Sequence, residues 1–71
     1  MKIYKIYDSG GETIDRYTIL TCPTECLGVD DCGGQVFSQW GACIDGKHLG
    51  KRIKFNDLPK ETQTHVLERL A

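Results

Sequence analysis

The chain has 71 residues, of which 39% are hydrophobic and 27% are charged, and this length and composition predict one globular domain. It contains no run of about 18 apolar residues, so the sequence offers no candidate membrane-spanning helix. Its first residues lack the apolar core and cleavage site of a secretory signal, and we expect an unprocessed chain in the host cytoplasm. A formal net charge of −1 argues against wholesale binding to a polyanion.

The near-neutral net charge hides an acidic middle and a basic end. Residues 22–46 contain no lysine or arginine and carry four carboxylates, those of Glu25, Asp30, Asp31 and Asp45. Residues 47–71 carry a net positive charge, and four of their cations fall within eight residues: Lys47, Lys51, Arg52 and Lys54. The four carboxylates form a candidate partner-binding patch, because long-range charge speeds the encounter with a basic surface.

The first block predicts a β-hairpin. Residues 2–8 and 13–21 are rich in Ile, Tyr and Thr, which favour strands, and the paired glycines between them suit a tight reversal. The alternation of the second strand is imperfect, because Tyr17, Ile19 and Leu20 cannot all share one face. We therefore expect a bulge there or burial on both faces.

The middle block, residues 22–46, is rich in glycine, and we expect it to be less regular. Pro23 has no amide donor for a strand pair, and turns are indicated by Gly28, Gly33 and Gly34. Residues 36–44 then predict a strand. It places on one face Val36, Ser38, Trp40, Ala42 and Ile44.

The last block predicts a strand and a helix. Residues 51–55 alternate with period two, so Ile53 and Phe55 point inward and the cations outward. Asp57 and Pro59 suit the start of a helix over about residues 58–70. Its apolar stripe consists of Leu58, Thr62, Val66 and Leu70, widened by Leu67, and leaves His65 in solvent. The fold class is a small α+β domain, an antiparallel sheet of three or four strands with the C-terminal helix packed on one face.

The four cysteines allow three interpretations. The first is burial as small hydrophobic side chains. The second is a structural zinc site, for which the ligand candidates are Cys22, Cys26, Cys32, Cys43 and His48. The third is at least one disulfide, with three pairings left open. We expect no cofactor, and zinc is the alternative. The acidic middle block disfavours zinc binding, because nearby carboxylates raise the pKa values of the thiols.

Catalytic chemistry has little support in the sequence. Cys43 and His48 are the one thiol and histidine pair worth naming, and no third group that would orient the histidine is identifiable. We therefore expect a protein that is not an enzyme. The clustered cations could contact nucleic acid, but Lys51 and Arg52 point to opposite faces of a strand, and lysines also protect an exposed edge strand from aggregation.

Two stretches resemble a group of short proteins from bacteriophages and other mobile elements. They are YKIYDSGG with DRYT, at residues 4–11 and 15–18, and HLGKRIKF with DLP, at residues 48–55 and 57–59. The resemblance also takes in Leu27-Gly28 and Gln39. Small proteins of this kind often occupy a surface of a host protein, as anti-CRISPR and other anti-defence inhibitors do.

These observations together predict a non-enzymatic interaction protein of inhibitor type. Its expected partner is a host protein or ribonucleoprotein complex, bound through the four carboxylates. We expect no membrane partner, and the sequence is compatible with a homodimer. The alternative is a zinc-stabilised module that contacts nucleic acid through the four clustered cations.

Overall fold

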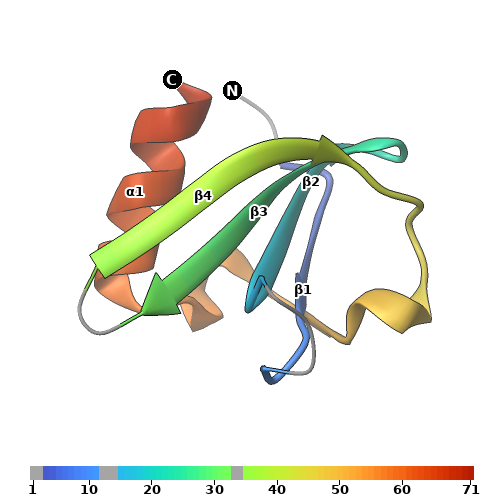
Figure 1. Ribbon diagram of the computed structural model, residues 1–71, viewed down its shortest axis with the longest axis horizontal. Helices are drawn as coiled ribbons and strands as arrows, with labels where there is room; N and C mark the ends of the chain where they lie inside the picture. Colours follow the sequence, from blue (N-terminus) through green and yellow to red (C-terminus); the bar gives the residue numbers. More distant parts are fainter. Residues whose placement is uncertain (1–2, 12–14, 33–34) are drawn as a thin grey trace.

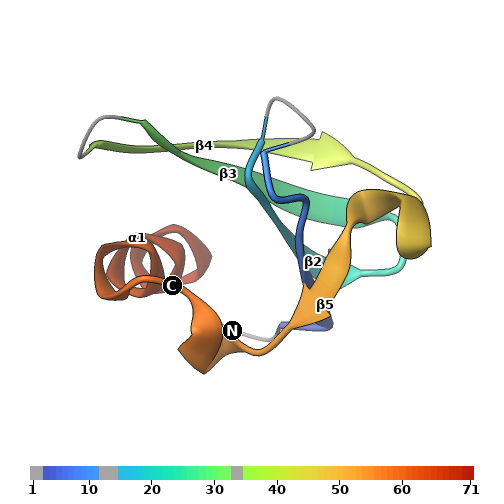
Figure 2. The same ribbon diagram turned by 90° about the horizontal axis from the view of Figure 1, so that it is seen from below.

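The computed structural model describes residues 3–11, 15–32 and 35–71, without the side chains of residues 31 and 32. In this part of the chain, five strands form one antiparallel sheet with a C-terminal helix on one face (Figure 1, Figure 2). The spatial order is β4 (Gln35–Ala42), β3 (Glu25–Cys32), β2 (Tyr17–Cys22), β1 (Lys5–Asp8) and β5 (Lys51–Ile53), and the helix is α1 (Lys60–Leu70). The α+β class is confirmed, with a sheet larger than three or four strands. The turn predicted at Gly33 and Gly34 lies outside the described residues.

The β1–β2 hairpin is confirmed, and the Asp8 side chain holds its turn. Asp8 accepts a hydrogen bond from the Gly10 N–H at 2.8 Å and pairs with Arg16 across the hairpin at 2.8 Å. The Arg16 guanidinium is the main reason why the pKa of Asp8 lies below its ordinary value. Gly10 and Gly11 have φ angles of 71° and 92°, a region that L side chains rarely adopt.

Burial on both faces explains the imperfect alternation in β2. Tyr17 and Ile19 face α1, whereas Leu20 points to the opposite face and joins a second, smaller apolar cluster. The pairing of β2 with β3 also shifts its register between Leu20 and Cys22. The chain therefore uses both of the predicted devices, a local irregularity and two buried faces.

The main core lies between the sheet and α1. Its buried residues are Ile6, Tyr17, Ile19, Leu27, Val29, Leu58 and Val66. Of the predicted helical stripe, Thr62 and Val66 are buried and Leu70 packs against the core. Leu58 is buried too, but it precedes the helix, and Leu67 is 43% exposed and does not widen the stripe.

The start of α1 differs from the prediction. A short 3-10 turn, Phe55–Asp57, precedes Pro59, and the helix begins at Lys60. The Asp57 carboxylate accepts a hydrogen bond from the Lys54 N–H at 3.0 Å. Asp57 therefore stabilises the 3-10 turn, and no side chain caps α1.

The expectation of an irregular middle block is wrong, because residues 25–32 form β3 between β2 and β4. The reversal comes earlier, at Pro23 and Thr24. Gly28 lies within the strand and not in a turn. The residue is a glycine because the Asp15 carboxylate occupies the space that a side chain would need. A Cβ on Gly28 would lie 2.7 Å from the Cγ atom of Asp15, so only glycine fits there without a shift.

β4 begins one residue earlier and ends two residues earlier than the predicted strand. Val36 packs against the main core, and Ser38 bonds to α1, which confirms the face expected for both. Trp40 follows on the same side of the strand and is 49% exposed. Ala42 and Ile44 are also exposed, and Ile44 lies beyond the end of the strand.

The sequence predicts that His65 lies in solvent, and the structure differs. Its ring is half-buried, and Nε2 lies 2.7 Å from the hydroxyl oxygen of Ser38. This hydrogen bond ties the middle of α1 to β4.

Replacing Gly28 with alanine should destabilise the fold, because the new Cβ would displace the Asp15 carboxylate. Gly41→Ala is the matched control on the neighbouring strand, where a Cβ meets no atom within 4 Å. We expect Gly28→Ala to lower the free energy of unfolding by about 1–3 kcal/mol, as overpacking does. Gly41→Ala should leave it unchanged or raise it by about 0.5–1 kcal/mol. Urea denaturation measures both variants, and equal stabilities would contradict this role of Gly28.

Candidate interaction surface

The residues between β4 and β5 cover one corner of the sheet face opposite α1. This 43–50 segment contains a 3-10 turn, Lys47–Leu49, and packs over the second apolar cluster. The cluster consists of Tyr7, Leu20, Cys26, Cys43 and Leu49. The sheet is thus buried on two faces at this corner, by the main core on the side of α1 and by the 43–50 segment on the other.

Asp45 fastens the 43–50 segment to β1. Its carboxylate pairs with Lys5 Nζ at 2.8 Å and accepts a hydrogen bond from the Tyr7 hydroxyl at 2.7 Å. The Lys5 ammonium, followed by the Tyr7 hydroxyl, lowers the pKa of Asp45 below its ordinary value. The same two hydrogen bonds raise the pKa of Lys5 and of Tyr7. Asp45 therefore has structural partners within the chain.

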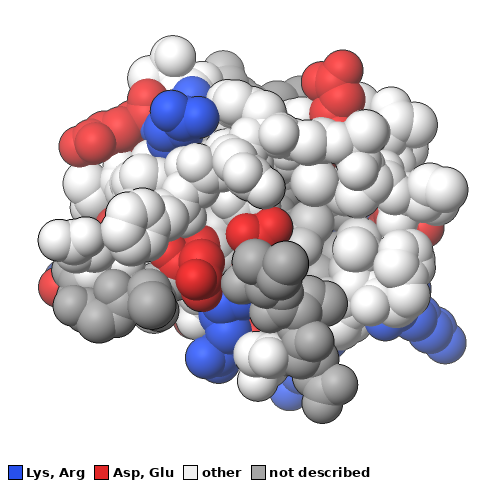
Figure 3. All heavy atoms as spheres, viewed as in Figure 1, with Lys and Arg blue, Asp and Glu red and all other residues white. Residues whose placement is uncertain are grey.

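The four predicted acidic residues are not gathered in mid-chain loops. Glu25, Asp30 and Asp31 belong to β3, and Asp45 alone lies in a connecting segment. Glu25 begins β3 and Asp30 lies near its end, so roughly 16 Å of strand separates them. The side chain of Asp31 is outside the described part. Figure 3 shows the acidic side chains of the viewed face as separate groups.

The four predicted nucleic-acid-binding cations lie at and around one edge of the sheet. Lys51 and Arg52 are adjacent residues of β5 and therefore point to opposite faces. Lys47 lies in the preceding 3-10 turn, Lys54 follows β5, and all four side chains are exposed. β5 is thus a short, charged edge strand, and such an edge discourages pairing with another sheet.

Of the predicted zinc ligands, Cys26 and Cys43 lie side by side. Cys26 is 8% exposed, and Cys43 packs against it in the second cluster. Burial, together with hydrogen bonding to the Cys43 thiol, raises the pKa of Cys26 to about 12. A thiol in such surroundings stays protonated and is a poor metal ligand at neutral pH.

The remaining candidate ligands do not complete a metal site in the described part of the chain. Cys22 is half-buried at the end of β2, and His48 is exposed on the 3-10 turn with its ring against Gly46. The side chain of Cys32 lies outside the description. Within the residues whose side chains are placed, no three Cys, His, Asp or Glu side chains come together as metal ligands would.

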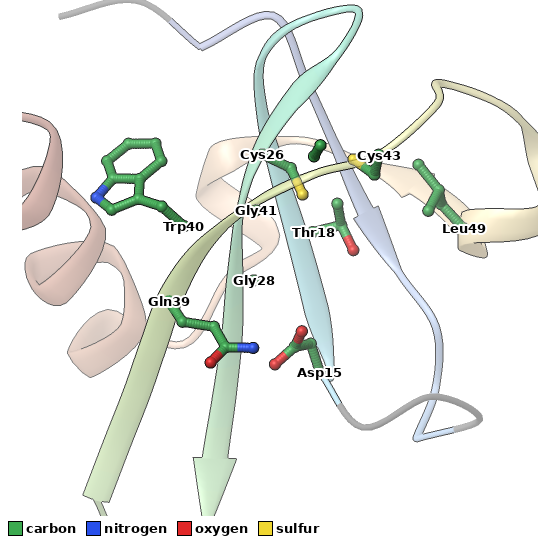
Figure 4. Close-up of a pocket in the computed structure, with 10 residues that line it drawn as sticks. Asp15, Thr18, Cys26, Gly28, Gln39, Trp40, Gly41, Cys43 and Leu49 are labelled. Carbon is green, nitrogen blue, oxygen red and sulfur yellow. The ribbon is translucent and has the colours of Figure 1, made fainter.

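A shallow depression of about 480 Å³ lies on the sheet face opposite α1. Its lining includes Asp15, Thr18, Cys26, Gln39, Cys43 and Leu49. In Figure 4 the side chains of Asp15 and Gln39 point toward one another at one end, and the two cysteines and Leu49 lie at the other. The Trp40 side chain points away from these residues, toward α1. The depression joins a polar end to an end lined with thiols.

β4 is the other edge of the sheet, and its chemistry is unlike that of β5. Its eight residues include no charged residue and no proline, and its pairing with β3 continues without a register shift. No other described strand pairs with its outer side. Phe37 is 55% exposed and Trp40 is 49% exposed, on opposite faces of the strand. A long, uncharged edge strand of this kind is a template for pairing with another chain.

No residue of β4 is among the site residues predicted from the sequence. One signal for it was present, because residues 33–44 contain no charged side chain. An uncharged run indicates an edge strand only when the strand order is known, because uncharged strands also occur in the middle of sheets.

Comparison of the chain with protein-family models, curated proteins and solved structures gave no match. In the described part of the chain, α1 has 11 residues, and no helix is long and apolar enough to span a bilayer.

Replacing Asp45 with asparagine should weaken the hold of the 43–50 segment. The pKa of Asp45 is depressed in the folded state, so its contribution to stability is complete above the unfolded pKa and is lost as the pH falls through the folded pKa. We therefore expect Asp45→Asn to be less stable than the wild type at pH 7 and to approach it in acid. Urea denaturation between pH 7 and pH 2 measures the difference. Glu68→Gln, at an exposed position of α1, is the control, and parallel pH profiles for wild type and Asp45→Asn would contradict the assignment.

Proposed function

We propose that this chain is a non-enzymatic interaction protein, an inhibitor-type factor of a mobile element, which binds a host protein by adding one of that protein's strands to β4. The observation that carries the proposal is the uncharged eight-residue edge of the sheet, with Phe37 and Trp40 exposed on it. The resemblance of residues 4–11 and 48–55 to mobile-element proteins supports a partner from the host.

The backbone of β4 has hydrogen-bonding groups available to such a strand. The Cys43 N–H donates to the Thr24 carbonyl at 3.3 Å, so the odd-numbered residues of β4 direct their backbone groups toward β3. The outward groups then belong to Val36, Ser38, Trp40 and Ala42. A partner strand can pair with all four residues without disturbing the β3–β4 ladder.

Phe37 and Trp40 supply the apolar contacts. Large aromatic side chains are enriched among the residues that dominate binding energy at interfaces. Because the two side chains stand on opposite faces of β4, an added strand would meet one aromatic neighbour on each of its own faces. The backbone pairing would give affinity, and the two aromatic side chains would give selectivity.

The acidic residues of β3 set the charge that we expect on the partner. Asp30 is in register with Phe37, and Glu25 is in register with Ala42, so a carboxylate lies one strand behind each end of the β4 edge. Neither position has a lysine or arginine beside it along the strand. An apolar partner strand with Lys or Arg near its ends fits this edge best.

Removing one outward amide should weaken partner binding strongly. Ser38→Pro deletes an N–H that faces away from β3, and proline is tolerated on edge strands. Ser38→Ala is the matched control, because it keeps the amide and loses only the hydroxyl that bonds His65. Affinity capture from host lysate with quantitative mass spectrometry identifies the partner, and titration calorimetry then gives Kd. We expect Ser38→Pro to weaken binding by about tenfold or more, and Ser38→Ala by about twofold or less.

A second variant protects this experiment against misfolding of the proline variant. Trp40→Lys places a charge on the edge in the manner of β5, and it should also weaken binding. Circular dichroism confirms that each variant is folded. If the partner is retained by both Ser38→Pro and Trp40→Lys, or if the wild type captures nothing, the proposal is wrong.

Reversing the charges at Glu25 and Asp30 tests the acidic contribution separately. Replacing both residues with lysine should weaken binding and flatten its dependence on salt concentration, because two attractive long-range interactions become repulsive. The double variant Glu61→Lys/Glu68→Lys, at exposed positions of α1, changes the net charge by the same amount and is the control. Association rates measured at several salt concentrations give the answer, and an unchanged salt slope in the double variant would exclude these carboxylates from the interface.

The zinc-stabilised module with nucleic-acid contacts gains no specific support from the arrangement of its residues. The four cations are divided between the two faces and ends of β5, and Cys26 and Cys43 alone of the described ligands are paired. We therefore propose only the protein-binding function.

A further inference from the structure

Two thiols meet beneath the 43–50 segment, on the sheet face opposite α1. Cys26 lies opposite Gly41, and Cys43 follows two residues later on the same face of the hairpin. In Figure 4 both sulfur atoms lie in the space beside Thr18. The packing of both side chains in the second apolar cluster agrees with this placement.

The geometry points to a redox-active dithiol, in which Cys26 and Cys43 are converted to an intramolecular disulfide by a low-molecular-weight disulfide such as oxidised glutathione. This inference does not depend on the proposed partner of β4. Cys22 is half-buried at the end of β2 and does not belong to the cluster that contains the pair.

The position of Cys43 allows the small approach that a disulfide needs. Diagonal neighbours on adjacent strands have Cβ atoms slightly less than about 7–8 Å apart, whereas a disulfide needs about 3.5–4.5 Å. Cys43 lies just after the last residue of β4, so it can move toward Cys26 while the β3–β4 ladder stays intact. Its N–H donates a 3.3 Å hydrogen bond to the carbonyl of Thr24, in the turn that precedes β3.

The two thiols have different access, which assigns their roles. The depression of about 480 Å³ is lined by both residues, Cys43 is half-buried, and Cys26 is almost fully buried. Cys43 loses its proton, and its thiolate attacks one sulfur of oxidised glutathione. This step forms a mixed disulfide and releases one glutathione thiolate, which takes up the proton that Cys43 lost. Cys26 then attacks Cys43 Sγ and gives up its proton to the departing glutathione sulfur, so that the second glutathione leaves as a thiol. Two protein thiols are oxidised, and one glutathione disulfide is reduced to two thiols.

The disulfide would close a covalent loop around the whole β3–β4 hairpin. A cross-link of this kind restricts the unfolded chain, so the oxidised protein should unfold at a higher temperature than the reduced protein. It would also hold the 43–50 segment at the end of β4, in addition to the ion pair of Asp45 with Lys5.

The test uses a Cys22→Ser/Cys32→Ser double variant of the full chain, in which Cys26 and Cys43 are the only thiols. The reduced protein is incubated with oxidised glutathione, alkylated, and analysed by intact mass and peptide mapping. We expect loss of both alkylatable thiols, a Cys26–Cys43 linked peptide, and formation at least about tenfold faster in the folded protein than in urea, because the fold holds the thiols together. Thermal unfolding should also shift upward on oxidation.

Single replacements separate the two roles. In the same background, Cys26→Ser should stop at the mixed disulfide with glutathione on Cys43, and Cys43→Ser should react at least about tenfold more slowly, because the buried thiol remains alone. The wild-type chain should give the same linked peptide. A mixed disulfide as the only product of the folded double variant, or a linkage that forms no faster than in urea, would overturn the inference.

Discussion

A sheet of five strands has more surface than the one α-helix in the described part of the chain can cover. α1 is 11 residues long, or about 16 Å, and it closes the main core on one face. Among the described residues, the 43–50 segment covers one corner of the opposite face, and the Asp45 contact with Lys5 and Tyr7 holds that segment in place. The uncovered parts, the β4 edge and the depression beside it, follow from this shortage of covering structure.

The two edges of the sheet make the consequence visible. β5 is three residues long and exposes Lys51 and Arg52, whereas β4 is eight residues long and exposes Phe37 and Trp40. Both edges face solvent in the described molecule, so general exposure does not explain the difference. A strand protected by charge at one edge and left unprotected at the other is the pattern expected of a sheet with one edge used for pairing.

Local patterns were enough to predict the hairpin around Gly10 and Gly11, the inward positions of Ile53 and Phe55, and the helical stripe of α1. β3 escaped prediction because Gly28 has the signature of a turn, and the reason for a glycine there is the Asp15 carboxylate, thirteen positions away in the chain. Asp45 was grouped with the other acids for a similar reason, since its partner Lys5 is 40 residues away. In each case a contact between distant residues decides the role of the side chain, and a one-dimensional pattern does not contain that contact.

The β3–β4 hairpin connects the edge with the thiol pair. Its register places Gly41 opposite Cys26, and this brings Cys43 to the thiol of Cys26 and sends the backbone groups of Trp40 outward. A shift of the register by one residue would exchange the faces of every β4 side chain, and with them both features. The β4 edge and the thiol pair therefore both depend on the β3–β4 register. Their chemistry is independent, because a partner strand needs the outward amides of β4, whereas a disulfide needs only the approach of two sulfur atoms.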